Sequence, residues 1–334
     1  MKRILFFLFL GFSGFSFAQS NINDLLAAGI EDAEQYTNDY LAPALEATIY
    51  NLGGSWYNTA DAKPLGGFEI SIVGNMAFYG NKDDKKAFVL NTADYQNLQF
   101  TDGSTSQTVS TALGDIEGVQ VFVEDDTGLV RADFELPSGL ASENINFIPS
   151  GFIQASVGLI KGTEVKARFL PKFNTDDVSF SLFGLGIQHE FTKHLPADKV
   201  LPVAISAVIG YTQLKGEYDF TSTSVVDGSD QRLDTNIQIW NFQAVVSTRL
   251  PIINFYGGLG YLSGKSETDV LGTYEVTSGP IQATYVDPFS VSADASGVIA
   301  NVGTKLKLGF FRLNADYSLG EFNRLTVGVN FGFR

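Results

Sequence analysis

The last stretch of the chain, residues 322–334, constrains the fold more than any other part of the sequence. Every second position is apolar: Leu325, Val327, Val329, Phe331 and Phe333. Because side chains alternate across an extended strand, one face is apolar and the other polar or small. Ordinary antiparallel sheets also end this way. The length, the aromatic end and the recurrence of the pattern upstream together favour the closing strand of a transmembrane barrel.

The start of the chain is typical of a secretory signal peptide. Met1-Lys2-Arg3 is followed by an apolar run from Ile4 to Phe17, with small residues at Ser16 and Ala18. A membrane anchor is the alternative, but the run is shorter than the roughly 20 residues that a spanning helix needs. We therefore expect residues 1–18 to be removed on export. The chain has no cysteine, which excludes lipoprotein attachment and disulfides.

The composition excludes two further classes of protein. No later stretch is apolar for the length of a spanning helix, which argues against a helical membrane protein but not against a barrel. The 34 Gly, 28 Phe and 13 Tyr suit tight turns and aromatic girdles. A net charge of −15 argues against a nucleic-acid partner.

Residues 19–62 differ from the rest of the chain because their apolar residues have helical spacing. Pro43 is expected to break or restart the helix. Two large aromatics, Trp56 and Tyr57, follow a glycine turn. The segment is either a periplasmic cap or a plug folded into a barrel lumen, and we favour the plug because it leads directly into the first strand. Its candidate contact residues are Glu31, Asp32, Glu34, Asp39, Trp56 and Tyr57.

Residues 63–334 predict a transmembrane antiparallel barrel of about fourteen strands, including three short strands within 86–124. Several predicted strands exceed the roughly 5–6 residues of a globular strand, and a tilted membrane strand needs about 9–11. The predicted connections alternate in length. The short ones at 310, 251, 161–162 and 125–128 fall on one side, expected to be periplasmic, and the long ones at 137–151, 219–234 and 265–296 fall on the other.

Charged residues on the polar faces of these strands are expected to point into the lumen. An Arg or Lys facing lipid at mid-membrane would cost roughly 2–4 kcal/mol. We expect most of them to form structural ion pairs with each other or with the plug. The lumen candidates are Glu164, Lys166, Arg168, Arg249, Lys305, Lys307, Arg312 and Asp316.

The sequence gives little sign of catalysis. The two histidines, His189 and His194, have no motif that fixes a partner for nucleophilic chemistry, and without cysteine they form no metal-ligand spacing. We therefore expect no enzyme activity, no cofactor and no metal. A hydrolase at the barrel rim that uses His189 remains the less favoured alternative.

The chain resembles a family of secreted barrel proteins known as a domain of unknown function. The resemblance rests on Tyr40-Leu41-x-Pro43, Gly53-x-x-Trp56-Tyr57-Asn58, Leu65-Gly66-Gly67-Phe68 and Pro149-Ser150-Gly151-Phe152. A helical segment ahead of about fourteen strands is also similar to the outer-membrane long-chain fatty-acid transporter family. That architecture implies an N-terminal plug and lateral release of apolar molecules, but the Asn-Pro-Ala opening of that family is missing.

Together these observations predict an outer-membrane barrel of a Gram-negative bacterium that allows passive passage of a small, apolar solute. The alternative is a structural or surface-interaction protein whose barrel anchors the segments 219–234 and 265–296. The expected partners are outer-membrane lipid, the barrel-assembly machinery and a small apolar ligand. Arg334 after Phe333 departs from the usual aromatic end that this machinery recognises.

Overall fold

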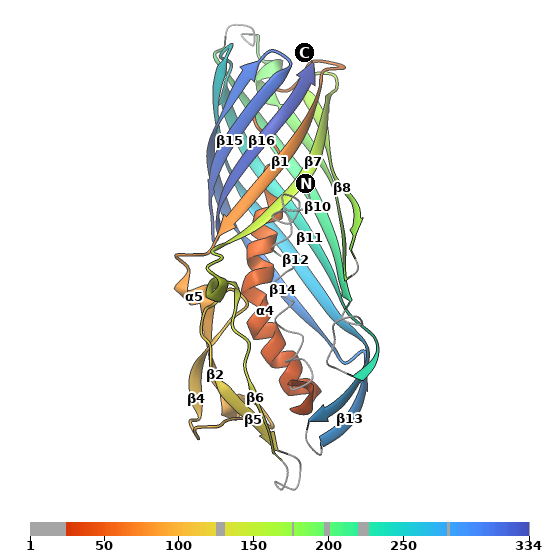
Figure 1. Cartoon of the computed structure of the whole chain (residues 1–334). Helices are drawn as coiled ribbons and strands as arrows, with labels where there is room; N and C mark the ends of the chain where they lie inside the picture. Colours follow the sequence, from red (N-terminus) through yellow and green to blue (C-terminus); the bar gives the residue numbers. More distant parts are fainter. Residues whose placement is uncertain are drawn as a thin grey trace.

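The computed structural model describes residues 25–124, 131–175, 177–196, 201–219, 227–278 and 281–333. The predicted signal peptide, the turn at 125–128 and Arg334 lie outside these residues. Ten antiparallel strands form a closed barrel, with one helix entering it (Figure 1). Among the described residues, no helix combines the length and the apolar character needed to cross a membrane.

The barrel strands follow one another around the ring in chain order. They are β1 (Phe68–Phe78), β7 (Phe147–Gly158), β8 (Thr163–Asn174), β9 (Val178–Glu190), β10 (Val203–Asp219), β11 (Asp227–Thr248), β12 (Ile253–Ser278), β14 (Phe289–Leu308), β15 (Phe311–Leu319) and β16 (Asn323–Phe333). The strand β16 closes the ring on β1, with Phe68 opposite Phe333 and Phe78 opposite Asn323. The prediction of a closing C-terminal strand is therefore confirmed. An eleventh strand, β13 (Ile281–Val286), pairs with β12 alone.

The predicted count of about fourteen barrel strands is wrong. The short strands β2 (Ala87–Asn91), β3 (Leu98–Phe100), β4 (Ser106–Ser110), β5 (Gln120–Glu124) and β6 (Arg131–Glu135) pair in two small separate sheets. Strands of three to five residues cannot span a bilayer, which needs about 9–11. These sheets, with α5 (Asp83–Lys86), η2 (Thr92–Asp94) and η3 (Leu140–Glu143), belong to one long connection between β1 and β7.

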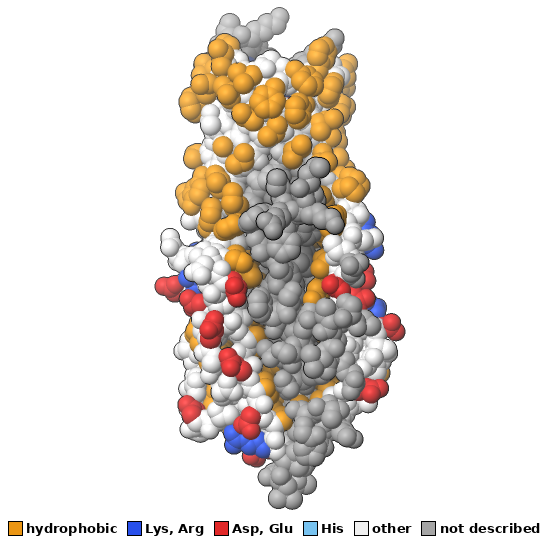
Figure 2. Space-filling model, viewed as in Figure 1, with side chains coloured by type: hydrophobic (Ala, Val, Ile, Leu, Met, Phe, Trp, Pro, Cys, Tyr) orange, Lys and Arg blue, Asp and Glu red, His pale blue; other side chains and the backbone are white. Residues whose placement is uncertain are grey.

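Within the apolar band, the outer surface of the barrel is apolar and the charged side chains of its strands point inward. On β1, Ile70 and Ile72 are 46% and 57% exposed, whereas the alternating Glu69 and Ser71 are 2% and 4% exposed. Figure 2 shows the resulting apolar band over the upper half of the molecule and the acidic side chains over the lower half. The band includes Phe169, Phe183, Leu185, Trp240, Phe255, Leu259, Val302 and Phe310. A water-soluble protein carries its apolar side chains mainly inside, so an apolar outer surface suits a barrel that is surrounded by lipid.

The two ends of the barrel differ. At the near end, where Phe68 and Phe333 lie, the connections at 161–162, 251 and 310 are short, as predicted, and η4 (Phe191–His194) follows β9. Four strands are 17 to 26 residues long in all: β10, β11, β12 and β14. At the far end they extend beyond the apolar band and form a tall wall (Figure 1). Much of 265–296, predicted to be a loop, is therefore strand.

The helix α4 (Ile30–Gly53) runs from the far end into the lumen (Figure 1). It continues through Pro43, where a break or restart was expected, because buried Tyr40, Leu41 and Leu45 hold it on both sides of the proline. Its first half packs against the small sheets and the tall wall. Its last turns pack inside the barrel, and residues 54–67 then cross the lumen to reach β1.

Candidate functional site

The segment that follows α4 fills the lumen around Trp56, which is fully buried. Glycines on β9 and β10 make room for its ring. A Cβ added at Gly186 would lie 2.7 Å from the ring of Trp56, and one at Gly210 would overlap it. Tyr57 lies next to Trp56 and hydrogen-bonds to Asn301 of β14. Both aromatics of the predicted plug are therefore placed inside the barrel.

Two wall arginines hold the end of the helix. Arg168 donates from Nη1 to the carbonyl of Leu52 (2.9 Å) and from Nη2 to that of Gly54, and Arg324 donates to the carbonyl of Tyr50 (2.7 Å). The last carbonyls of a helix have no partner within it and carry a partial negative charge. Arg168 was predicted to line the lumen. Arg324 was missed, although it follows the same alternation as Thr326.

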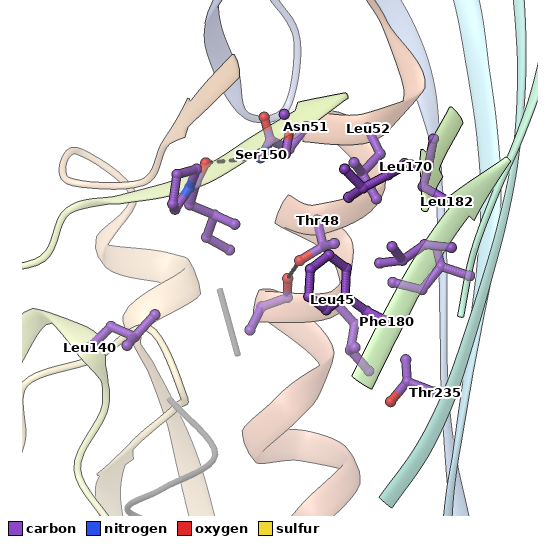
Figure 3. A pocket seen from close by; sticks show the side chains of 16 residues that line it. Leu45, Thr48, Asn51, Leu52, Leu140, Ser150, Leu170, Phe180, Leu182 and Thr235 are labelled. Carbon is purple, nitrogen blue, oxygen red and sulfur yellow. Dashed lines mark hydrogen bonds between the residues drawn. The ribbon is translucent and has the colours of Figure 1, made fainter. Parts of the chain in front are cut away.

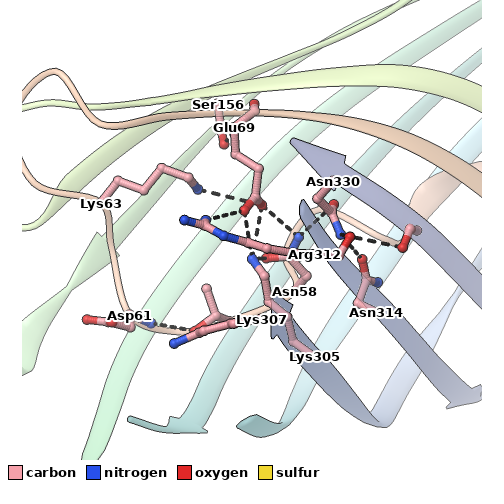
Figure 4. A network of polar contacts seen from close by, with 12 residues as sticks. Asn58, Asp61, Lys63, Glu69, Ser156, Lys305, Lys307, Arg312, Asn314 and Asn330 are labelled. Carbon is pink, nitrogen blue, oxygen red and sulfur yellow. Dashed lines mark hydrogen bonds and ion pairs between the residues drawn. The ribbon is translucent and has the colours of Figure 1, made fainter. Parts of the chain in front are cut away.

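A second group of charges occupies the near end of the lumen (Figure 4). The carboxylate of Glu69 accepts from Lys305 (2.9 Å) and Arg312 (2.7 Å). Lys63 and Lys166 lie 3.1 and 2.6 Å from Glu164. The same cluster also contains Asn58, which donates to Glu69 and accepts from Lys305. We call these residues the near-end cluster. Four predicted lumen residues thus meet in it, while Lys63, Asn58 and Glu69 were missed.

The remaining predicted lumen residues lie around this cluster. Arg249 pairs with Glu190 and has its Nε 3.6 Å from Asp61. Lys307 is half-buried at the near end, with Nζ 3.5 Å from the carbonyl of Leu250. Asp316 accepts a hydrogen bond from Tyr256 (2.8 Å). Arg249 and Lys307 thus add polar contacts at the near end, while Asp316 lies further along β15, opposite Thr326.

The acidic residues predicted for the plug are placed elsewhere. Asp32 is buried outside the barrel and accepts from the backbone N–H groups of Gln96, Asn97 and Leu98. Glu31 also contacts Gln96, and Glu34 and Asp39 are exposed. Partial burial still raises the pKa of Asp39. A helix of 24 residues is about 36 Å long, so its first half stays outside when its end reaches the lumen. Asp61 of the plug pairs with the wall cation Arg249 instead, and the other carboxylates that pair with wall cations, Glu69 and Glu164, belong to the wall itself.

The barrel wall opens between β7 and β8. Their pairing begins at Gly158 with Glu164 and stops at Ile153 with Phe169, although both strands continue. Extending this register would set Gly151 opposite Pro171 and Pro149 opposite Phe173. Proline has no N–H to donate and is confined to strand edges and bulges. Pro171 lies in a bulge of the β8–β9 pairing. We call this opening the lateral gap.

An apolar pocket lies directly inside the lateral gap (Figure 3). It has a volume of about 90 Å³ and is bounded by α4 on one side and the barrel wall on the other. Its lining contains no charged side chain. The lining residues are Ala44, Leu45, Thr48, Asn51, Leu52, Leu140, Ile148, Pro149, Ser150, Gly151, Leu170, Phe180, Leu182, Leu214, Thr235 and Ile237. The volume is of the same order as cavities that hold benzene-sized molecules.

The two histidines lie together at the near end. His189 contacts Thr163 through Nδ1 (3.0 Å) and His194 through Nε2 (3.1 Å). Across the parts of the chain that the structure describes, no group of three or more His, Asp or Glu side chains could hold a metal ion. Among the described residues, the pair therefore belongs to no such metal-binding group.

Comparison with known proteins gives a family but no activity. The model described as "Family of unknown function (DUF6588)" matches residues 1–333. A search of curated proteins found no match.

Solved structures of other barrels are distantly similar. Ail, the attachment invasion locus protein of Yersinia pestis, is 10% identical with a TM-score of 0.28, covering 80% of this chain and 99% of its own. The translocator domain of the autotransporter NalP from Neisseria meningitidis is 10% identical with a TM-score of 0.28, covering 80% and 88%. A Pseudomonas aeruginosa FadL homologue is 9% identical with a TM-score of 0.21, covering 84% and 94%. Likeness at this level carries no argument about function.

Proposed function

Because the chain belongs to the family of unknown function DUF6588, whose description assigns no activity, we propose a function from the geometry alone. The protein is an outer-membrane barrel that takes up a small apolar solute from the far end and releases it sideways through the lateral gap. The observation that carries this proposal is the uncharged pocket behind that gap.

The apolar band supports the membrane location. Exposed Ile, Leu, Val and Phe side chains cover the strands of the closed ring, and charged side chains such as Glu69, Lys166 and Arg168 point inward. In water such a band would be unfavourable, whereas in a bilayer it matches the lipid. With short connections at the near end, the usual arrangement of bacterial barrels places that end in the periplasm and the tall wall outside the cell.

The filled lumen argues against straight passage through the barrel. Trp56 and Tyr57 occupy its middle, and the near-end cluster occupies the periplasmic mouth. A solute that reaches the pocket from beside α4 meets the lateral gap before it meets these residues. Ile153 and Phe169, at the edge of the gap, are both exposed on the lipid-facing surface. An apolar solute that leaves there passes these two apolar side chains as it enters lipid.

Closing the gap tests the proposal. The chain has no cysteine, so Ser150→Cys with Lys172→Cys introduces the only thiols, one on each side of the gap. A short bifunctional maleimide then joins β7 to β8. We expect this cross-link to reduce the entry of radiolabelled toluene into cells at least tenfold, towards the rate of cells without the protein.

The control cross-link joins strands that are already paired. Asn174→Cys and Ser179→Cys lie opposite each other on β8 and β9, and joining them leaves the gap open. Toluene entry should then be unchanged. Equal entry with both cross-links would overturn the lateral route. Entry no faster than in cells without the protein would favour the alternative of a structural or surface-interaction barrel.

A further inference from the structure

A polar hollow of about 450 Å³ lies on the outer face of the barrel, on the far-end side of the apolar band. Its lining extends across the strands from Lys172 on β8 to Asp269 on β12. Lys215 on β10, between these two, lies on the same face of its strand as the exposed Ile209. Tyr218, on the other face of β10, is buried in the core cluster that includes the first half of α4. The hollow therefore opens away from α4, and we call it the outer hollow.

The first feature of the outer hollow is a pair of lysines. Ser181 of β9 lies opposite Lys215 on one side and opposite the β8 bulge that contains Lys172 on the other. The two lysines are thus separated by a single strand, and both are exposed. Among the described residues, neither ammonium group forms an ion pair with a carboxylate. Two such cations side by side favour an anion that both can contact.

The lysines lie where the apolar band ends. The exposed side chains of Phe183 on β9 and Phe169 on β8 are opposite each other. Phe183 is the outward position next to Ser181, about 7 Å away along the strand. An ammonium group this close to the edge of an apolar band lies at the level of the lipid headgroups, where phosphates are found.

The second feature of the outer hollow is a row of carboxylates further from the band. Glu217, Asp234 and Asp269 lie directly opposite one another on β10, β11 and β12, one outward position beyond Lys215. Like charges in such positions destabilise a sheet. Arg232 lies 3.7 Å from Asp234, and among the described residues the other two carboxylates pair with no cation. A cation placed over this row would relieve the repulsion.

The outer surface therefore has a defined order away from the band: apolar, then positive, then negative. A phospholipid with an ethanolamine headgroup has the complementary order, because its phosphate follows the acyl chains and its ammonium lies beyond the phosphate. A headgroup that ends in glycerol would satisfy the lysines and leave the carboxylate row without a cation.

We infer that the outer hollow binds one outer-leaflet phospholipid with an ethanolamine headgroup. Its phosphate contacts Lys172 and Lys215, and its ammonium lies over Glu217 and Asp269. The acyl chains then lie on the apolar band beside Phe169, which is at the edge of the lateral gap, so this lipid borders the proposed exit. The inference rests on the membrane orientation in the proposed function. The toluene test of that function does not depend on which lipid is bound, so the two can fail separately.

Native mass spectrometry of the full-chain protein in detergent measures the binding. Phosphatidylethanolamine and phosphatidylglycerol with identical acyl chains compete at equal concentration, and lipid A is titrated separately. We expect one phosphatidylethanolamine to bind about fivefold more tightly than phosphatidylglycerol, which corresponds to about 1 kcal/mol of charge complementarity. Lipid A should bind more weakly than phosphatidylethanolamine, and EDTA should leave the preference unchanged.

Variants separate the two halves of the headgroup. Lys172→Gln and Lys215→Gln remove contacts to the phosphate, so each should weaken both phospholipids about fivefold. Glu217→Gln combined with Asp269→Asn removes the contacts to the ammonium and should make the two affinities equal, with phosphatidylglycerol still bound. Arg131→Gln removes an exposed cation from the small sheets, far from the band, and is the control that should change neither affinity.

Several results would overturn the inference. Equal affinities for the two phospholipids in the wild-type protein would do so, as would tighter binding of lipid A. Binding that neither lysine variant weakens, or a preference that survives loss of the two carboxylates, would show that the lipid lies elsewhere on the barrel. Loss of the preference in EDTA would show that a metal ion, and not an ammonium group, lies over the carboxylate row.

Discussion

The guanidinium carbon of Arg168 lies 3.6 Å from the centre of the Trp56 ring, so a wall arginine covers the aromatic that fills the lumen. The same guanidinium donates to the carbonyls of Leu52 and Gly54. One side chain therefore joins the barrel wall, the helix end and the plug aromatic. Stacking of this kind adds about 0.5–2 kcal/mol to the hydrogen bonds.

Replacing this arginine should loosen the plug. Arg168→Ala leaves two buried carbonyls without partners, and we expect it to lower the free energy of unfolding by about 3 kcal/mol. Urea unfolding in lipid measures this loss, and planar-bilayer recordings should show more frequent ion-conducting openings. Arg232→Ala removes an exposed arginine from the tall wall and is the control. Openings as rare as in the wild-type protein would show that Arg168 does not hold the plug.

The near-end cluster depends on Glu69. It is the carboxylate shared by Lys305 and Arg312, with Lys63 3.8 Å away. Glu69→Gln leaves buried cations without compensation and should cost about 3–5 kcal/mol of unfolding free energy. Adding Lys305→Met should recover part of that loss, which a double-mutant cycle in urea would measure. Strictly additive losses would mean that the two side chains act independently.

Two strand glycines provide a test of the space around the plug. At Gly210 a Cβ would overlap the Trp56 ring, whereas at Gly74 it would meet nothing within 4 Å. Gly210→Ala should therefore displace Trp56, reduce the near-ultraviolet circular dichroism and destabilise the barrel by about 1–3 kcal/mol. Gly74→Ala should change neither quantity. Equal changes in circular dichroism and stability in both variants would show that Trp56 does not depend on the space left by Gly210.

Asp32 is expected to hold the small sheets against the helix. Its carboxylate accepts three backbone N–H groups at 2.8, 2.8 and 3.1 Å. Asp32→Ala should speed hydrogen exchange at residues 96–98 by at least tenfold while the barrel strands exchange as before. Glu34→Ala changes a neighbouring exposed carboxylate and should have no such effect. Unchanged exchange at 96–98 in the Asp32 variant would contradict this role.

Alternation along each strand was enough to predict the closed antiparallel barrel and its inward charges. Glu164, Lys166, Arg168 and Lys305 are all buried as expected, because a charge on the opposite face would meet lipid. The strand number was not predictable in the same way. Buried and exposed residues do alternate along Gln120–Glu124, as in a strand. Whether such a strand joins the barrel depends on its length and on the strand with which it pairs.

The pocket, like the number of strands, could not be predicted from local sequence patterns. Pro149 and Pro171 are visible in the sequence, but only the register of β7 and β8 shows that both lie where pairing stops. The acidic residues of α4 were assigned to the lumen because their segment leads directly into the first strand. The length of the helix, which no local pattern relates to the depth of the lumen, places them outside.

The course of residues 54–67 has a consequence for how the molecule is built. The helix meets the lumen from one mouth and β1 starts at the other, so the chain is threaded through the ring that its own strands form. The seam between β1 and β16 joins the first and last strands of that ring. In the folded molecule this seam therefore encloses the thread, so opening the pairing of β1 with β16 would free the segment sideways as well as along the barrel axis.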